Sequence, residues 1–150
     1  MSDPVVRALA VVADTEAPRE DRARAAAEIV RGARDYRWVG IYDVGDEEIG
    51  AIAYTGSEAP AHPRFDVSLG LSGEAVRTRM TVVSNDVAED PRYFTAFEST
   101  RSEAVVPVLG PESGVVIGTL DVESDRTGAF STEDVAFLED CAAVLRPLFD

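Results

Sequence analysis

The sequence of 150 residues contains one cysteine, Cys141, one histidine, His62, and no lysine. A single cysteine excludes an intramolecular disulfide and is typical of a chain kept in a reducing compartment. One histidine without a cysteine partner provides no zinc-type ligand pattern and no visible Ser-His-Asp arrangement. The acidic run that contains Asp86, Glu89 and Asp90 lacks the spacing of a calcium loop. We therefore expect no metal, no cofactor and no catalytic residue.

The positive charge is equally restricted. All 14 basic residues are arginines, and 28 acidic residues leave a formal net charge of -14. Such a surface repels the phosphates of nucleic acids and anionic lipids. Long hydrophobic runs are missing too, and no cationic segment precedes an apolar stretch at the N-terminus. The sequence predicts a cytoplasmic protein without nucleic-acid or membrane partners.

What is present predicts one domain, because the length and the hydrophobic fraction of 45% allow a full core. Two helices are expected over 5–13 and 20–35, so that 1–35 holds the N-terminal helices and 36–150 the remaining fold. The last helix begins at Ser131 or Thr132, with acids in its first turn. Its apolar stripe, also a candidate dimer surface, consists of Val135, Leu138, Ala142 and Leu145.

Strands separated by Gly/Pro-containing turns are expected over 38–44, 49–55, 81–84, 103–109 and 115–123. A short extended piece covers 65–68, and a short helix covers 74–78. Gly70 and Gly73 form the entrance to this helix, and Ser72 is a candidate N-cap. The order predicts an α+β fold: a central antiparallel sheet, helices packed on one face, and a loop-covered pocket on the other.

Three acids interrupt the two most apolar strands. Glu103 begins one strand, whereas Asp121 and Glu123 end the next, so a hairpin brings all three to the same end. Asp121 and Glu123 are two residues apart and share a face. A carboxylate inside an apolar strand costs free energy unless a partner offsets it. The three acids either bind a cationic ligand group or point to solvent at the strand ends.

Aromatic residues accompany these acids. Trp38 and Tyr42 share one face of the strand over 38–44 and are candidate apolar walls. The long polar segment 85–100 contains Tyr93, Phe94 and Phe97. Aromatic residues in such a segment indicate that it packs down, either as a lid over a pocket or as ordinary satellite packing.

The motifs and their order resemble a GAF domain. The resemblance covers about residues 25 to 149 and rests on the segments 38–42, 70–76, 85–87, 102–108, 116–124 and 130–134. It implies a GAF-like, profilin-like fold that holds a small molecule. Within this family the chain resembles the free methionine-R-sulfoxide reductases. That resemblance implies an aromatic wall at Trp38 and Tyr42, and carboxylates at Glu103, Asp121 and Glu123 that hold the amino group of a free amino acid.

The chain departs from these reductases at the cysteines. Ser72 stands where one pocket cysteine is expected, and Ala96 stands about where another is expected, whereas Cys141 belongs to the last helix. A serine hydroxyl cannot replace a thiolate, because the reduction passes through a sulfenic acid and a disulfide. The covalent bilin of photosensory GAF domains also requires a pocket cysteine.

The sequence therefore predicts a sensor or signalling module that binds a small polar, amine-bearing ligand without catalysis. A homodimer is expected, and a separate signalling protein is a further expected partner. Two alternatives remain: a reductase-like enzyme that uses other residues, and a dimerising regulatory domain. The predicted ligand-binding residues are Trp38, Tyr42, Ser72, Tyr93, Phe97, Glu103, Asp121 and Glu123.

Overall fold

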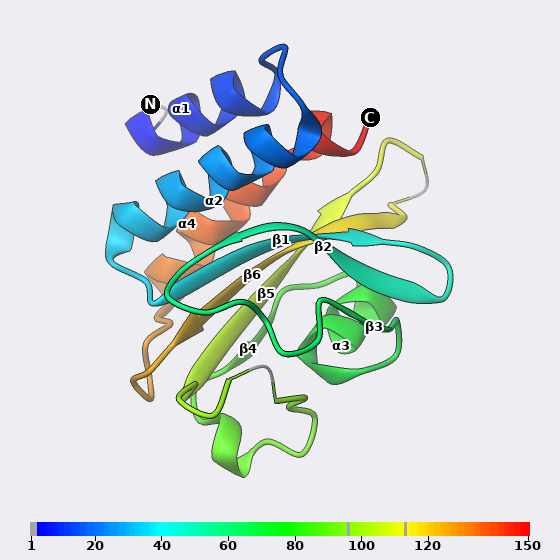
Figure 1. The fold of residues 1–150 in the computed structure, drawn as a ribbon. Helices are drawn as coiled ribbons and strands as arrows, with labels where there is room; N and C mark the ends of the chain where they lie inside the picture. The colour runs from blue at the N-terminus through cyan, green and yellow to red at the C-terminus, as the bar shows by residue number, and fades with distance from the viewer. Residues whose placement is uncertain (1–2, 96, 113) are drawn as a thin grey trace.

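The computed structural model describes residues 3–95, 97–112 and 114–150. Its centre is a six-stranded antiparallel sheet in the order β3-β2-β1-β6-β5-β4 (Figure 1). The strands are β1 (Trp38–Val44), β2 (Glu48–Thr55), β3 (Arg64–Asp66), β4 (Val82–Ser84), β5 (Ser102–Leu109) and β6 (Val116–Ser124). The helices are α1 (Pro4–Ala13), α2 (Arg19–Arg34), α3 (Gly70–Thr78) and α4 (Thr132–Ala143), with short 3-10 turns at Val87–Glu89 and Arg146–Phe149. The predicted α+β fold is confirmed.

One face of the sheet carries α1, α2 and α4, and α3 lies with the loops on the other face (Figure 1). Alternate residues of the strands point into this helical layer, among them Val39 and Ile41 of β1 and Leu120 and Val122 of β6. The last helix contributes Leu138, Ala142 and Cys141, all buried. Leu145, which follows α4, is fully buried as well. The predicted apolar stripe therefore belongs mainly to the core rather than to a surface open to a partner.

Helix ends follow the local sequence in two cases and depart from the prediction in one. Ser131 caps α4, because its side chain accepts from the backbone N–H of Asp134 while the Asp134 carboxylate accepts from Ser131. Asp35 ends α2 in the left-handed conformation. The expectation that Ser72 caps a helix over 74–78 is wrong. The helix begins at Gly70, four residues earlier, and Ser72 lies in its first turn.

The pairing register decides which side chains meet on the face opposite the helices. Glu123 lies opposite Glu103 of β5 and opposite Trp38 of β1. Asp121 lies opposite Gly40 of β1. Side chains of residues that are directly opposite in an antiparallel pair share a face. The acids of β5 and β6 are thus brought beside the aromatic residues of β1.

Among the helices in the described part of the chain, none combines the length and the apolar character that a membrane span requires.

Candidate functional site

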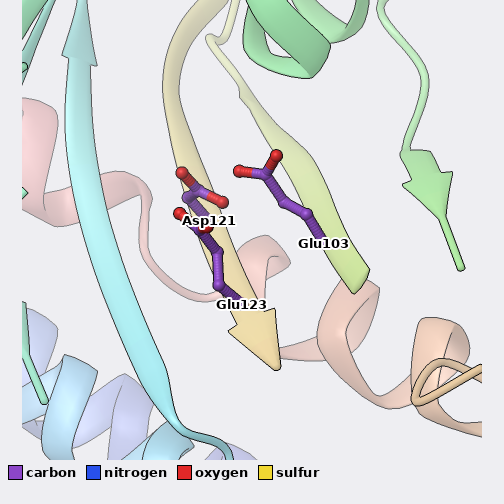
Figure 2. A group of neighbouring side chains, drawn as sticks. All are labelled: Glu103, Asp121 and Glu123. Carbon is purple, nitrogen blue, oxygen red and sulfur yellow. The ribbon is translucent and has the colours of Figure 1, made fainter. Parts of the chain in front are cut away.

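Three carboxylates converge on the face of the sheet opposite α1, α2 and α4. Figure 2 shows Glu103 of β5 reaching toward Asp121 of β6, with Glu123 beside Asp121. Oxygen atoms of the three groups lie within 4.8 Å of one another. The residues are 6%, 5% and 0% exposed, respectively. We call this cluster the carboxylate triad. Its burial rules out the alternative that these acids point to solvent.

The triad is only partly satisfied by hydrogen bonds. The Thr100 hydroxyl donates to Glu123 Oε1 at 2.8 Å. Asp121 Oδ1 and Glu123 Oε2 remain buried without a partner among the described residues. A buried acceptor left unpaired costs roughly 1–3 kcal/mol, so the site is poised to accept donors from a ligand.

Burial raises the pKa of every acid in the triad, and the charges of neighbouring acids raise it further for Glu103 and Glu123. For Glu103 the causes are burial first, then the charges of Asp121 and Glu123, and its pKa lies well above the ordinary value. Burial raises the pKa of Asp121 to about 6, and burial together with Asp121 raises that of Glu123 to about 8. Two unit charges 4 Å apart repel by roughly 4 kcal/mol at an effective dielectric constant of 20. The three acids therefore do not all ionise near neutral pH.

A small, partly open cavity adjoins the triad. Its lining residues are Tyr42, His62, Phe65, Leu69, Gly70, Leu71, Ser72, Phe94, Glu103 and Asp121. The cavity volume is about 20 Å³, which is room for roughly one water molecule. Aromatic rings line it, with ring centroids 4.7 Å apart for His62 and Phe94 and 5.8 Å apart for Phe65 and Phe94. We call His62, Phe65 and Phe94 the aromatic roof.

The wall formed by the start of α3 has the opposite electrostatic character. Leu69, Gly70, Leu71 and Ser72 line the cavity. The N-cap residue is Leu69, which provides no side-chain cap to the first turn. The first N–H groups of a helix lack partners within the helix and carry partial positive charge. The cavity thus lies between a cluster of acids and a helix end suited to an anionic group.

The predicted site residues fall into two sets. Tyr42, Ser72, Glu103 and Asp121 line the cavity directly. The residues outside this lining are Trp38, Tyr93, Phe97 and Glu123. The Trp38 ring lies 6.3 Å from Tyr42 and 5.1 Å from Phe97, between centroids. The Tyr93 hydroxyl donates to the Phe97 carbonyl at 3.4 Å.

The prediction of the pocket missed His62, Phe65, Leu69 and Phe94, which all line the cavity. All four come from short or irregular segments whose path depends on tertiary contacts. Phe94 belongs to the segment 85–100, and its aromatic character was the one available signal. For His62, the signal was a lone imidazole between Ala61 and Pro63 in a loop rich in proline.

Larger hollows lie elsewhere on the surface, and two of them exceed 500 Å³. One, of about 540 Å³, surrounds the turn between β1 and β2 and includes Arg19, Asp43 and Arg64. The other, of about 550 Å³, lies between β5 and α4 and includes Met80 and Leu109. Neither is lined by a buried, unpartnered polar atom of the described residues. The small cavity beside the triad is therefore the better candidate site.

Cysteine chemistry has no place in this cavity. Cys141, the one cysteine of the sequence, is fully buried in the core between the sheet and the helices. Burial raises the pKa of its thiol to about 12, so the thiolate needed for nucleophilic attack does not form near neutral pH. Ser72 lines the cavity with a hydroxyl. The other position compared with a reductase cysteine, Ala96, lies outside the described residues.

The model of the family described as "GAF domain" matches residues 19–146. The chain belongs to the GAF domain family. A relative, GAF domain-containing protein A of Dictyostelium discoideum, is 30% identical over 105 residues, which are 69% of this chain and 64% of the relative. The match thus spans slightly less than two thirds of that relative's length.

Solved structures of this GAF domain's relatives include free methionine-R-sulfoxide reductases. The type II enzyme from Thermoplasma acidophilum is 33% identical, with a TM-score of 0.81 and 94% of each chain covered. The enzyme from Neisseria meningitidis, in complex with its substrate, is 27% identical, with a TM-score of 0.85 and coverage of 99% of this chain and 92% of that one. The predicted resemblance to GAF domains of the reductase type, without the catalytic cysteines, is confirmed.

Proposed function

We propose that this GAF domain binds a free amino acid of the methionine type and does not reduce it. The observation that carries the proposal is the carboxylate triad, three buried acids with two unpartnered oxygens. A primary ammonium group has three N–H donors and one positive charge. It therefore supplies both the charge and the donors that the triad lacks.

The other end of an amino acid is a carboxylate. The uncapped first turn of α3 on the opposite wall suits such a group, because its N–H groups and the helix dipole favour an anion. An apolar side chain would lie against Tyr42, Phe65 and Phe94. The relatives named as free methionine-R-sulfoxide reductases support this choice of ligand, since one of them was solved with its substrate.

Entry of such a ligand requires the roof to open. The cavity of about 20 Å³ holds nothing larger than about one water molecule. Phe94 belongs to the segment 85–100, and His62 belongs to the loop before β3. Outward movement of these two rings is the smallest change that exposes Glu103 and Asp121 to a ligand.

Binding without reduction follows from the missing thiol. Sulfoxide reduction by a thiol needs an accessible thiolate that attacks sulfur, and a second thiol that resolves the sulfenic acid. The chain has one cysteine, Cys141, buried away from the cavity. We therefore assign a binding role, as a ligand sensor or a ligand store, and no turnover.

Thermal unfolding tests the proposal with L-methionine and with each of its two sulfoxide epimers. A ligand at about a hundred times its Kd stabilises the fold by about 2.7 kcal/mol. For a domain of this size, that raises Tm by roughly 5–10 °C. The analogue in which a hydroxyl replaces the amino group, 2-hydroxy-4-(methylthio)butanoate, should give no shift, because it brings no charge to the triad.

Variants locate the binding. Asp121→Asn and Glu103→Gln should abolish the shift, whereas Glu112→Gln, an exposed acid in the β5–β6 turn, should preserve it. A shift with the hydroxy analogue equal to that with methionine would refute the role of the triad. A shift with cyclic AMP or cyclic GMP alone would refute the amino-acid ligand. Loss of methionine sulfoxide in the presence of a thiol reductant, above a control without protein, would refute the absence of catalysis.

A further inference from the structure

Among the residues that the structure describes, no basic side chain forms an ion pair with the carboxylate triad. The ion pairs of the described residues include none of its three members. The nearest basic influence is Arg37, whose charge acts on Glu123 while its guanidinium lies over the Phe97 ring, 5.6 Å from the centroid. Three acids with oxygens within 4.8 Å therefore remain without a neutralising side chain. In the free protein, neutralisation must therefore come from solvent, as protons or as a cation held by the three carboxylates.

The other titratable groups around the triad do not change this conclusion. Tyr42 of β1 is a neutral phenol whose pKa is raised by burial and by the three acids. The Tyr93 hydroxyl donates to the Phe97 carbonyl. Asp90 adds negative charge near Glu103, but its own carboxylate is paired with Arg92 at 2.7 Å. His62 faces the cavity from the aromatic roof.

The close approach of the three acids indicates that protons are held among them. Their oxygens lie within 4.8 Å of one another in a buried site, where ionised groups would repel without compensation. Asp121 Oδ1 and Glu123 Oε2 are buried and unpartnered, so a proton at either position removes an uncompensated negative charge.

We infer that the carboxylate triad is a proton-exchange site: the free protein holds protons on it, and the ammonium group of an incoming ligand expels them to solvent. The inference rests on the proposed function, since it concerns how the same site takes up its ligand. For each ammonium group bound, about one proton leaves, so the charge of the site is unchanged. The ligand nitrogen keeps its three protons and donates them to the carboxylates.

Proton exchange makes the affinity depend on pH. Release of one proton predicts that the Kd for L-methionine rises about tenfold for each unit by which pH falls, in the range where the free triad is protonated. A protein of this kind responds to ligand concentration and to pH together. If the carboxylates were permanently ionised, the affinity for the same ligand would not depend on pH above the ordinary pKa range of carboxyl groups.

Calorimetry with L-methionine at pH 7.5 measures the exchange. The titration is run in phosphate, which has a small heat of ionisation, and in Tris, which has a large one. For one proton released per ligand bound, the heat of binding should differ between the buffers by about the difference between their heats of ionisation. The wild type and Glu112→Gln should show the same difference. Equal heats in the two buffers would overturn the exchange and leave methionine binding intact.

Infrared spectroscopy tests the stored protons without a ligand. The free protein at pH 7.5 should show the carbonyl stretch of protonated carboxylic acids, and Glu103→Gln should weaken this band. L-Methionine should also weaken it in the wild type. Absence of the band from the free protein would overturn the inference. Presence of the band, with no methionine binding, would refute the proposed ligand and leave the protonated triad standing.

Discussion

At the scale of single residues, the triad that is proposed to bind the ligand also lowers the stability of the ligand-free protein when its acids ionise. A carboxylate whose pKa is raised on folding binds its proton more tightly in the folded protein than in the unfolded chain. Its contribution is therefore fully present below the unfolded pKa and is lost as pH rises through the folded pKa. For Asp121 and Glu123 these folded values are about 6 and about 8. The free energy of unfolding of the ligand-free protein should accordingly fall between pH 5 and pH 9.

Glu123→Gln tests this dependence. The amide keeps an oxygen acceptor for Thr100, which bonds Glu123 Oε1, and carries no charge. One unit of pKa shift corresponds to about 1.4 kcal/mol. The free energy of unfolding of the variant should therefore exceed that of the wild type by at least ~1 kcal/mol at pH 9. At pH 5 the two values should be close to each other. Denaturant unfolding at a series of pH values measures the difference. The exposed Glu112→Gln should follow the wild type, and parallel profiles for all three proteins would show that Glu123 is not responsible.

At the scale of elements, α3 is where the start of a helix and the site meet. Gly73 lies in the first turns of α3, and a Cβ there would overlap the backbone carbonyl of Ser68. Gly32 lies in α2 with no heavy atom within 4 Å of such a Cβ. Replacing glycine by alanine raises helix propensity by the same amount at both positions. The difference in stability change between the two substitutions therefore measures the effect of the close contact between residue 73 and the backbone of Ser68.

The two alanine substitutions should act in opposite directions. Gly32→Ala should stabilise the protein by about 0.5–1 kcal/mol, because alanine loses less backbone entropy on folding. Gly73→Ala should destabilise it by about 1–3 kcal/mol, because the methyl group meets backbone rather than a movable side chain. Urea unfolding measures both. Equal stabilisation by the two would mean that α3 shifts freely, and that Gly73 does not fix the helix against the cavity.

Among the elements, the sequence predicted the features that depend on the alternation of side chains along a strand. It missed the features that depend on tertiary contacts. The bounds of β1 were predicted as Trp38–Val44. Asp121 and Glu123 were placed on one face because they are two residues apart in a strand. Hairpin geometry placed Glu103 at the same end. The start of α3 was predicted too late, because Ser72 is a common N-cap residue and Leu69 is not. No local pattern places His62 over Phe94, since their loops are positioned by the rest of the fold.

At the scale of the whole molecule, the sheet separates two regions of different character. The face under α1, α2 and α4 is a continuous apolar core, which includes Leu9, Val30 and Leu138. The opposite face holds the triad, a small cavity and the segment 85–100. Much of that segment has no regular secondary structure, and its backbone hydrogen bonds include Val87 N to Arg101 O at 2.9 Å and Tyr93 N to Asp90 O at 3.1 Å. Segments with few such bonds open more easily than the core.

Hydrogen exchange should therefore divide the chain into a slow and a fast part, and the ligand should slow both: the slow part because it raises global stability, and the fast part because it restrains the segment 85–95 directly. Amides of β1, β5 and β6 exchange through near-global opening, whereas those of 85–95 exchange through local opening of the segment that carries Phe94. Saturating L-methionine should slow exchange in 85–95 and in the first turn of α3, because the bound ligand contacts the roof and restrains it. Mass spectrometry of deuterated peptides measures this, with Asp121→Asn as the control in which methionine changes nothing. Slowing confined to amides that exchange through global opening, with 85–95 unchanged, would indicate that the ligand does not contact the roof, and would place the entrance to the cavity elsewhere.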